Sequence, residues 1–262
     1  MSSAKAEATE TLVQVGEFNV KVQIAGDGPP VVLIHGAGGI SDAPGLAMLT
    51  EAHRTYAIEV PGFGSSPLNE KSPSLRALAS TVSGAIEKLE IGSHAVIGTS
   101  VGARLALWHA IDSGEQVESL ILVSPAAILP EGVAVPTIAP QFLLRSVGTG
   151  SASPTGFAFG GAQEEQLLGR IFGSGRDDEL EQAMSSLEVP TLVLFGDEDF
   201  QVPAETGRIY QELMPTCFYI LVHRAGSLIA HERPEAFASV VGDFLEYREQ
   251  FIYSHKTGVL NP

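Results

Sequence analysis

The amino-acid sequence predicts an α/β fold: a doubly wound, mostly parallel sheet of about eight strands, with a small helical lid inserted after the sixth strand. Two observations support this prediction. Six short runs are rich in β-branched residues and nearly all apolar, which is typical of parallel strands that helices cover on both faces. Helical stretches separate most of these runs, and such alternation builds a doubly wound sheet.

The first two expected strands, 11–15 and 19–24, alternate apolar and polar side chains around a turn at Gly16 and Glu17. This pattern is typical of an edge hairpin with one face in water. The apolar runs that follow are 30–34, 55–60, 94–97, 119–123, 191–195 and 218–222. The core helices are expected at 74–89, 102–111, 204–213 and 234–247.

The stretch 128–187 interrupts the alternation of strands and helices. We expect it to form a lid (cap) over the ends of the strands, which leaves 1–127 and 188–262 as the core domain. It passes through a loop rich in Gly, Ser and Phe at 147–161 and ends in helical patterns at 163–171 and 177–186. A long disordered loop is the alternative interpretation. After Phe251 we expect an ordinary or poorly ordered terminus.

Charge and cysteine content restrict the function classes. The 262 residues include 15 basic and 31 acidic side chains, and the net charge of -16 disfavours nucleic acid and anionic membrane surfaces as partners. The single cysteine, Cys217, is expected to be a buried structural thiol in a reducing compartment, and no metal or cofactor is expected. The sequence shows no signal-peptide core and no apolar run near the roughly 18 residues of a membrane span. We therefore expect a soluble, cytoplasmic protein of open oligomeric state that acts on a small molecule.

A serine between two glycines is the most informative motif. Ser100 lies between Gly98 and Gly102, after the expected strand 94–97 and before the expected helix 102–111. In such a strand–turn–helix elbow, Cβ atoms two residues either side of the serine would collide, and the strained turn lifts the hydroxyl above the sheet edge. The motif predicts a nucleophilic serine. An ordinary glycine-rich turn is the alternative.

Acyl transfer also needs two preorganised donors for the developing oxyanion. The first is expected to be the amide of Val101, directly after Ser100. The second is expected from the glycine-rich loop after strand 30–34, where the amide of Ala37 is the candidate and Gly36 and Gly38 let the backbone approach a ligand. His35, at the start of this loop, is expected to brace it by hydrogen bonding rather than to act as a base.

Over essentially its whole length the chain resembles the α/β-hydrolase fold superfamily, in its serine-hydrolase type. The resemblance rests on five segments in family order: HGAGG from His35, PGFGSS from Pro61, GTSVG from Gly98, GDEDFQVP from Gly196 and AGSLIAHERPEAF from Ala225. It implies that the acid of a catalytic triad stands at the last acidic position of the G-x-x-D pattern, which is Asp199. Asp197 is the secondary candidate for this acid.

The last triad position departs from the family pattern. Family members carry a histidine five residues before the glutamate of the E-x-P-E segment, and five residues before Glu232 stands Ser227. A serine cannot take the proton of Ser100, and enzymes that lose a triad member keep only about 10³- to 10⁴-fold acceleration over water. His231 is a weak substitute, because one helical turn would place it about 6 Å further along the axis. His223 is weaker still.

The sequence therefore predicts a serine hydrolase that acts on a small apolar ester, lactone or C–C cleavable carbonyl compound through an acyl-enzyme at Ser100. With Ser227 in place of the histidine, the chain as written is expected to be inactive or severely impaired. The alternative is a non-hydrolytic homologue that binds a ligand or acts as a lyase or isomerase. Two origins of Ser227 remain open: an engineered inactivation, or a natural homologue that has lost hydrolysis.

Overall fold

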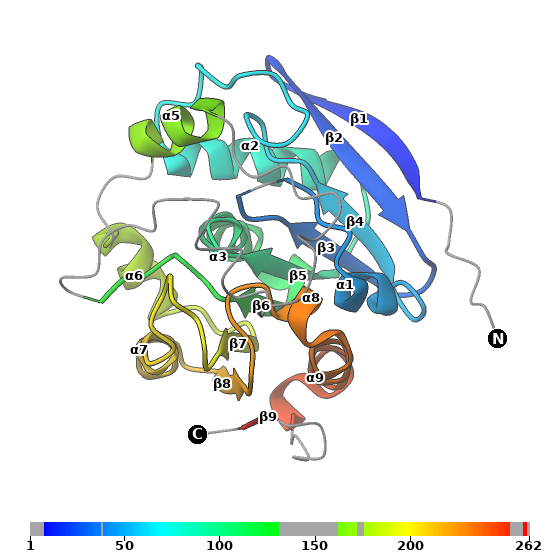
Figure 1. Ribbon diagram of the computed structural model, residues 1–262. Coiled ribbons are helices and arrows are strands. Elements are labelled where there is room, and N and C mark those ends of the chain that lie inside the picture. The colour runs from blue at the N-terminus through cyan, green and yellow to red at the C-terminus, as the bar shows by residue number, and fades with distance from the viewer. Residues whose placement is uncertain (1–7, 38, 131–161, 172–175, 252–258, 261–262) are drawn as a thin grey trace.

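The computed structural model describes residues 8–37, 39–130, 162–171, 176–251 and 259–260 (Figure 1). Within these residues one sheet of nine strands runs through the molecule in the order β1-β2-β4-β3-β5-β6-β7-β8-β9. The strands are β1 (Thr9–Val15), β2 (Phe18–Ala25), β3 (Pro30–Ile34), β4 (Arg54–Ile58), β5 (His94–Thr99), β6 (Val117–Val123), β7 (Thr191–Gly196), β8 (Cys217–Val222) and β9 (Val259–Leu260).

The pairing directions agree with the expected doubly wound sheet. Strands β3 to β8 pair in parallel, and antiparallel pairs occur at the ends of the sheet, where β1 pairs with β2, β2 with β4 and β8 with β9. The edge hairpin aligns Val15 with Phe18 across a turn in which Gly16 has φ +56°, a left-handed conformation that favours glycine. The fold class expected from the sequence is confirmed.

Helices cover both faces of the sheet. They are α1 (Pro44–Leu49), α2 (Leu75–Lys88), α3 (Gly102–Ser113), α5 (Ala162–Ile171), α6 (Asp178–Met184), α7 (Thr206–Leu213), α8 (Ile229–Glu232) and α9 (Pro234–Tyr247), with 3₁₀ turns η1 (Gly114–Gln116) and η2 (Arg248–Gln250). One apolar cluster joins the sheet to α2, α3, α6 and α7, and a second joins it to α1 and α9. Val96 of β5 belongs to the first cluster and its neighbour Ile97 to the second, because successive strand residues point to opposite faces.

Several elements differ from the sequence-based expectations. The terminus expected after Phe251 includes β9, whose two residues pair with Leu221 and Val222 of β8. Two residues are too few to give a strand pattern, so the sheet has one strand more than the expected number. Helices α1 and α8 were also not expected, since each is shorter than two turns. Strand β4 ends at Ile58, two residues before the expected end.

The two helical patterns expected within 128–187 correspond to α5 and α6. Asp177 caps α6, because its side chain accepts a hydrogen bond from the Leu180 amide at 3.1 Å. Leu167 of α5 and Met184 of α6 pack in the first apolar cluster. Residues 131–161 and 172–175 lie outside the described residues, so the lid and the domain division stay predictions. Of the helices that the structure describes, none has both the length and the apolar character to cross a membrane.

Candidate active site

Ser100 lies at the turn between β5 and α3, with φ +50°. Residues other than glycine seldom adopt this left-handed conformation, so the turn holds local backbone strain. Three backbone hydrogen bonds fix it: the Ser100 amide donates to the Val123 carbonyl at 3.0 Å, and the Ser100 carbonyl accepts from the Ala103 and Ala126 amides, both at 3.1 Å. The next parallel strand and the segment that follows it therefore hold the serine in place.

The two glycines of the elbow are required by tertiary neighbours. A Cβ at Gly98 would lie 2.6 Å from the Cβ of Ala106 in α3. A Cβ at Gly102 would lie 2.2 Å from the His35 carbonyl oxygen, in the loop after β3. Both distances are far below van der Waals contact. Gly98 therefore lets α3 pack closely on β5, and Gly102 lets the loop after β3 approach the start of α3.

The glycine-rich loop after β3 is held by His35, as the sequence suggested. The Val60 amide donates to its Nε2 at 2.9 Å, so Nδ1 carries the proton and donates to the Gly36 carbonyl at 2.6 Å. Burial lowers the pKa of His35 to about 4, which keeps the ring neutral. A Cβ at Gly36 would lie 2.9 Å from the Cβ of Ser100, so the loop packs directly on the elbow. Gly38 lies outside the described residues.

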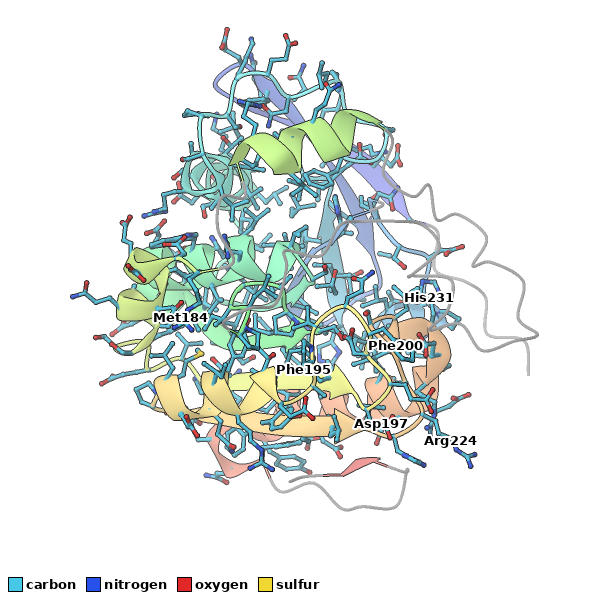
Figure 2. All side chains as sticks on the ribbon, turned by 60° about the vertical axis from the view of Figure 1, so that its left-hand side comes forward. Met184, Phe195, Asp197, Phe200, Arg224 and His231 are labelled. Carbon is cyan, nitrogen blue, oxygen red and sulfur yellow. The ribbon has the colours of Figure 1, made fainter. Side chains whose placement is uncertain are left out.

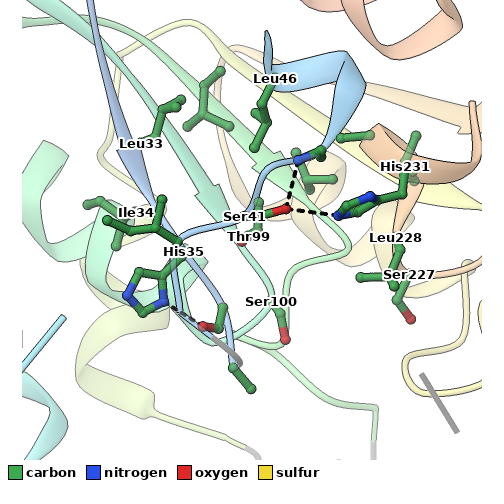
Figure 3. Close-up of a pocket in the computed structure, with 18 of the residues that line it drawn as sticks. Leu33, Ile34, His35, Ser41, Leu46, Thr99, Ser100, Ser227, Leu228 and His231 are labelled. Carbon is green, nitrogen blue, oxygen red and sulfur yellow. Dashed lines mark hydrogen bonds between the residues drawn. The ribbon is translucent and has the colours of Figure 1, made fainter. Parts of the chain in front are cut away.

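Ser100 opens into a pocket at the carboxyl ends of the strands (Figure 3). The expected oxyanion residues Gly36, Ala37 and Val101 belong to its wall. Most of the remaining wall is apolar and includes Leu33, Ile34, Ile40, Leu46, Ile97, Val123, Leu228 and Ile229. A pocket with these walls suits an apolar small molecule whose reacting group lies near Ser100.

The loops that carry Asp199 and Ser227 are held together by close backbone contact. A Cβ at Gly196, the last residue of β7, would lie 2.0 Å from the Ala225 carbonyl oxygen. The Glu198 amide donates to the same oxygen at 2.8 Å, and the Gly226 amide donates to the Glu232 carboxylate at 2.8 Å. These contacts place Ser227 beside Asp199.

Asp199 directs one carboxylate oxygen into a set of hydrogen bonds. Its Oδ1 accepts from the Ser227 hydroxyl at 2.7 Å, from the Gln201 amide at 2.9 Å and from the Val202 amide at 3.1 Å. Its Oδ2 is buried and has no hydrogen-bond partner among the described residues. Burial raises the pKa of Asp199, although the hydrogen bonds from Ser227 and the two amides oppose the shift.

Asp197, the secondary candidate for the acid, binds elsewhere. Its carboxylate accepts from His223 Nδ1 at 2.6 Å and from the Arg224 amide at 2.7 Å. Figure 2 shows Asp197 and Arg224 close together, away from His231. Asp197 and His223 thus brace the turn after β8, and neither belongs to the pocket wall.

Ser227 and His231 both line the pocket with Ser100, but the helical relation expected between them is absent. Helix α8 begins at Ile229, so Ser227 lies before it and the two side chains do not share a helix face. His231 Nε2 is hydrogen-bonded to the Ser41 hydroxyl at 2.8 Å, and this hydroxyl also accepts from the Ala43 amide at 3.1 Å (Figure 3). Burial lowers the pKa of His231, against the smaller opposing effect of Asp42.

Sequence reasoning missed Ser41 and Gln201 as pocket residues. Ser41 lies outside the five family segments, and in the GDEDFQVP segment only the acidic residues were considered as site residues. The sequence separation between Ser41 and His231 is 190 residues. Cys217, expected to be a buried thiol, is only partly buried, although desolvation raises its pKa to about 12. Among the described residues, no group of three or more His, Cys, Asp and Glu side chains is arranged to hold a metal ion.

The parallel sheet with a serine at the β5–α3 turn defines the class of α/β-hydrolase folds. The sequence model described as "Alpha/beta hydrolase family" matches residues 31–240, and the chain belongs to this family. The prediction of a hydrolase-fold enzyme is therefore confirmed.

Three similar proteins illustrate the family. The chain is 23% identical to a 2-hydroxy-6-oxo-6-(2'-aminophenyl)hexa-2,4-dienoic acid hydrolase of Metapseudomonas resinovorans, over 94% of each chain. It is 26% identical to a pimeloyl-[acyl-carrier protein] methyl ester esterase of Aeromonas salmonicida, over 87% of this chain and all (100%) of that one. A crystal structure of a serine hydrolase involved in carbazole degradation, the CarC enzyme, superposes with a TM-score of 0.73 at 22% identity, over 92% of this chain and 100% of that one.

Proposed function

We propose that this protein is a serine hydrolase in which Ser100 forms the acyl-enzyme, and that Ser227 severely impairs the chain as written. One observation carries the proposal: Ser100 is held with φ +50° in the wall of an apolar pocket that Ala37 and Val101 also line. A strained turn that presents a hydroxyl to a pocket is costly unless the hydroxyl has a use.

In the complete form of this site, Ser100 Oγ attacks the acyl carbon of the substrate. The carbonyl oxygen becomes an oxyanion, which the amides of Val101 and Ala37 stabilise. A base at position 227 takes the hydroxyl proton and returns it to the leaving group, while Asp199 orients that base. In the chain as written, the Asp199 carboxylate accepts instead from the Ser227 hydroxyl at 2.7 Å. A hydroxyl of ordinary pKa cannot accept the proton of Ser100 at neutral pH.

The proposed substrate is a small apolar ester, lactone or C–C cleavable carbonyl compound. The apolar pocket wall supports this class. The names of two relatives, a methyl ester esterase and a hydrolase of an oxo-dienoic acid, point in the same direction. We further propose that the stretch 128–187 caps the pocket, and that the protein works in the cytoplasm, where a single cysteine would stay reduced. The net charge of -16 argues against nucleic-acid partners.

The test is the substitution Ser227→His. General-base catalysis is worth about 10²- to 10⁴-fold, so we expect hydrolysis of a short acyl ester to rise by that order. The matched control is the double variant Ser100→Ala with Ser227→His, which should return to the rate of the unmodified chain. A Ser227→His variant with native circular dichroism and no gain in rate would show the proposal to be wrong.

A non-hydrolytic homologue that binds a ligand, or acts as a lyase or isomerase, is the second candidate. The Ser227–Asp199 hydrogen bond favours it, because this bond satisfies one carboxylate oxygen without an imidazole. A fluorophosphonate probe distinguishes the two candidates, since it reports an activated serine. Rapid labelling of Ser100 in the unmodified chain would contradict the non-hydrolytic function and indicate another base within reach.

A further inference from the structure

At one side of the pocket, in its wall and directly behind it, lie buried polar atoms without hydrogen-bond partners. We call Ser124, Asp199, Gln201 and Ser227 the acidic corner. Asp199 Oδ2, the Ser124 hydroxyl and the Gln201 side-chain nitrogen are all buried and have no hydrogen-bond partner among the described residues. Ser124 favours the ionised form of Asp199, but its geometry does not complete a hydrogen bond. Gln201 and Ser227 line the pocket, so the corner adjoins the space in front of Ser100.

The acidic corner is costly for the free protein. A buried carboxylate oxygen without a complete hydrogen bond loses its hydration, and the contribution of Ser124 only partly replaces it. Desolvation accordingly raises the pKa of Asp199. A ligand that donates an N–H to Oδ2 removes this penalty, whereas a hydrocarbon or an anionic group leaves it in place.

We propose that the acidic corner binds a small nitrogen base of the imidazole class, whose ring N–H donates to the Asp199 carboxylate. A flat ring is compatible with the apolar wall that Leu228 and Ile229 contribute beside Ser227. The unpartnered Gln201 amide and Ser124 hydroxyl offer further hydrogen bonds to the same ligand. An imidazole has a donor nitrogen and an acceptor nitrogen, so it can use the carboxylate and one of these groups, or the Ser100 hydroxyl, together.

The consequence for chemistry rests on the proposed function. The ring nitrogen that does not face Asp199 would accept the Ser100 proton as Oγ forms its bond to the acyl carbon, which gives an imidazolium beside the carboxylate. The imidazolium would then return this proton to the leaving alkoxide as the bond from acyl carbon to leaving oxygen breaks. The base is regenerated, so it acts as a catalyst and not as a reactant.

The first experiment measures binding of imidazole to the intact protein by NMR titration at pH 8.5, well above the ring's pKa near that of histidine, about 6.5. We expect saturable binding in the millimolar range, as befits a five-atom ring. Asp199→Asn should weaken it about tenfold or more, since a charged hydrogen bond is worth 1.5–3 kcal/mol. The matched control Asp197→Asn, on the same turn but outside the pocket, should leave the affinity unchanged.

N-methylimidazole gives the decisive comparison, because its neutral form has the same shape of ring but no N–H to donate. We expect at least tenfold weaker binding than imidazole at pH 8.5. Equal affinity for the two rings, or equal affinity of the unmodified chain and the Asp199→Asn variant, would overturn the proposal. Ser227→His should also abolish imidazole binding, because the new side chain would occupy the corner.

Rates of ester hydrolysis then show which source supplies the base. Rescue of the unmodified chain by free imidazole, saturating at the measured Kd and lost in Ser100→Ala, assigns the base to a separate small molecule. Faster turnover of an ester that carries an imidazole than of its phenyl counterpart assigns the base to the substrate. The two proposals fail separately. If Ser227→His is active but the unmodified chain does not bind imidazole, only the base site is refuted. If the unmodified chain binds imidazole but Ser227→His is inactive, only the hydrolase is refuted.

Discussion

Acid should destabilise this protein through a buried histidine pair behind the elbow, His94 on β5 and His109 on α3. His94 Nδ1 donates to the Gly92 carbonyl at 2.8 Å, so its Nε2 must accept a hydrogen bond from His109 Nε2, which lies 3.0 Å away. His109 Nδ1 in turn accepts from the Ser83 hydroxyl at 3.0 Å. Every ring nitrogen is satisfied in the neutral state. A proton added to His94 Nε2 would place two N–H groups face to face, and a proton added to His109 Nδ1 would create a buried charge.

The size of the effect follows from the pKa of His109. Burial, with a smaller contribution from His94, lowers it from 6.5 to about 4. Below pH 6.5 the unfolded chain takes up a proton that the folded chain refuses until about pH 4, so stability falls as pH falls through this window. At ~1.4 kcal/mol per unit of pKa, the difference between 6.5 and about 4 corresponds to a loss of about 3.5 kcal/mol. His35, whose pKa is also lowered to about 4, adds a comparable loss. Asp199 opposes it, since its raised pKa favours the folded state in acid.

The assay is urea denaturation between pH 7.5 and 4.5, which yields the free energy of unfolding at each pH. In the variant His109→Asn, the free energy of unfolding should depend less steeply on pH, by about one proton or ~1.4 kcal/mol per pH unit. This difference in slope should appear whatever the stability of the variant at neutral pH. Ser113→Ala is the matched control: it removes a hydroxyl 3.2 Å from His109 Nδ1 but no titrating group, so the slope should persist. An unchanged slope in His109→Asn would refute the reasoning.

Two further predictions concern the elbow and the acid. Gly102→Ala should destabilise the protein by about 2–4 kcal/mol in denaturant titrations, because its Cβ would meet the His35 carbonyl oxygen at 2.2 Å; an unchanged midpoint would contradict the close packing. Asp199→Asn should stabilise the protein at pH 7 in the same titrations, because the neutral amide avoids burying a charge. This advantage should disappear as the pH falls through the raised pKa of Asp199. Lower stability of the variant at pH 7 would contradict the conclusion that Oδ2 has no hydrogen-bond partner.

The parallel strands and the elbow could be predicted because their residue patterns follow from burial and from the geometry of the turn. The six parallel strands have runs of apolar, β-branched residues because both faces are buried, and the two apolar clusters occupy those faces. The glycines around Ser100 were predicted from the geometry of the turn. The atoms that require them belong to other elements, namely α3 and the loop after β3. The same glycines that allow the turn thus also allow the long-range packing.

Elements that depend on distant partners could not be predicted. The strand β9 is defined by its pairing with β8, and a segment of two residues is too short to show the alternating pattern of a strand. Ser41 and His231 bond across a sequence separation of 190 residues, so neither residue indicates the other. The short helix α8 begins after Ser227 and not before it, which changed the relation between positions 227 and 231. A shift of one or two residues in a helix boundary changes which side chains share a helix face, and helix propensity does not determine the boundary that closely.

The charge of Asp199 is not needed for the stability of the turn that contains it. Its structural task is to accept hydrogen bonds from the Gln201 and Val202 amides, and this task needs one oxygen and no charge. An asparagine oxygen could perform it without the desolvation that raises the pKa of Asp199. A buried charge with one unpartnered oxygen therefore has no structural explanation in the turn itself. Such a cost is typical of a site that is completed by a ligand or by a catalytic partner. The imidazole proposal places an N–H donor against this carboxylate, and in the complete hydrolase site the carboxylate would orient the base at position 227.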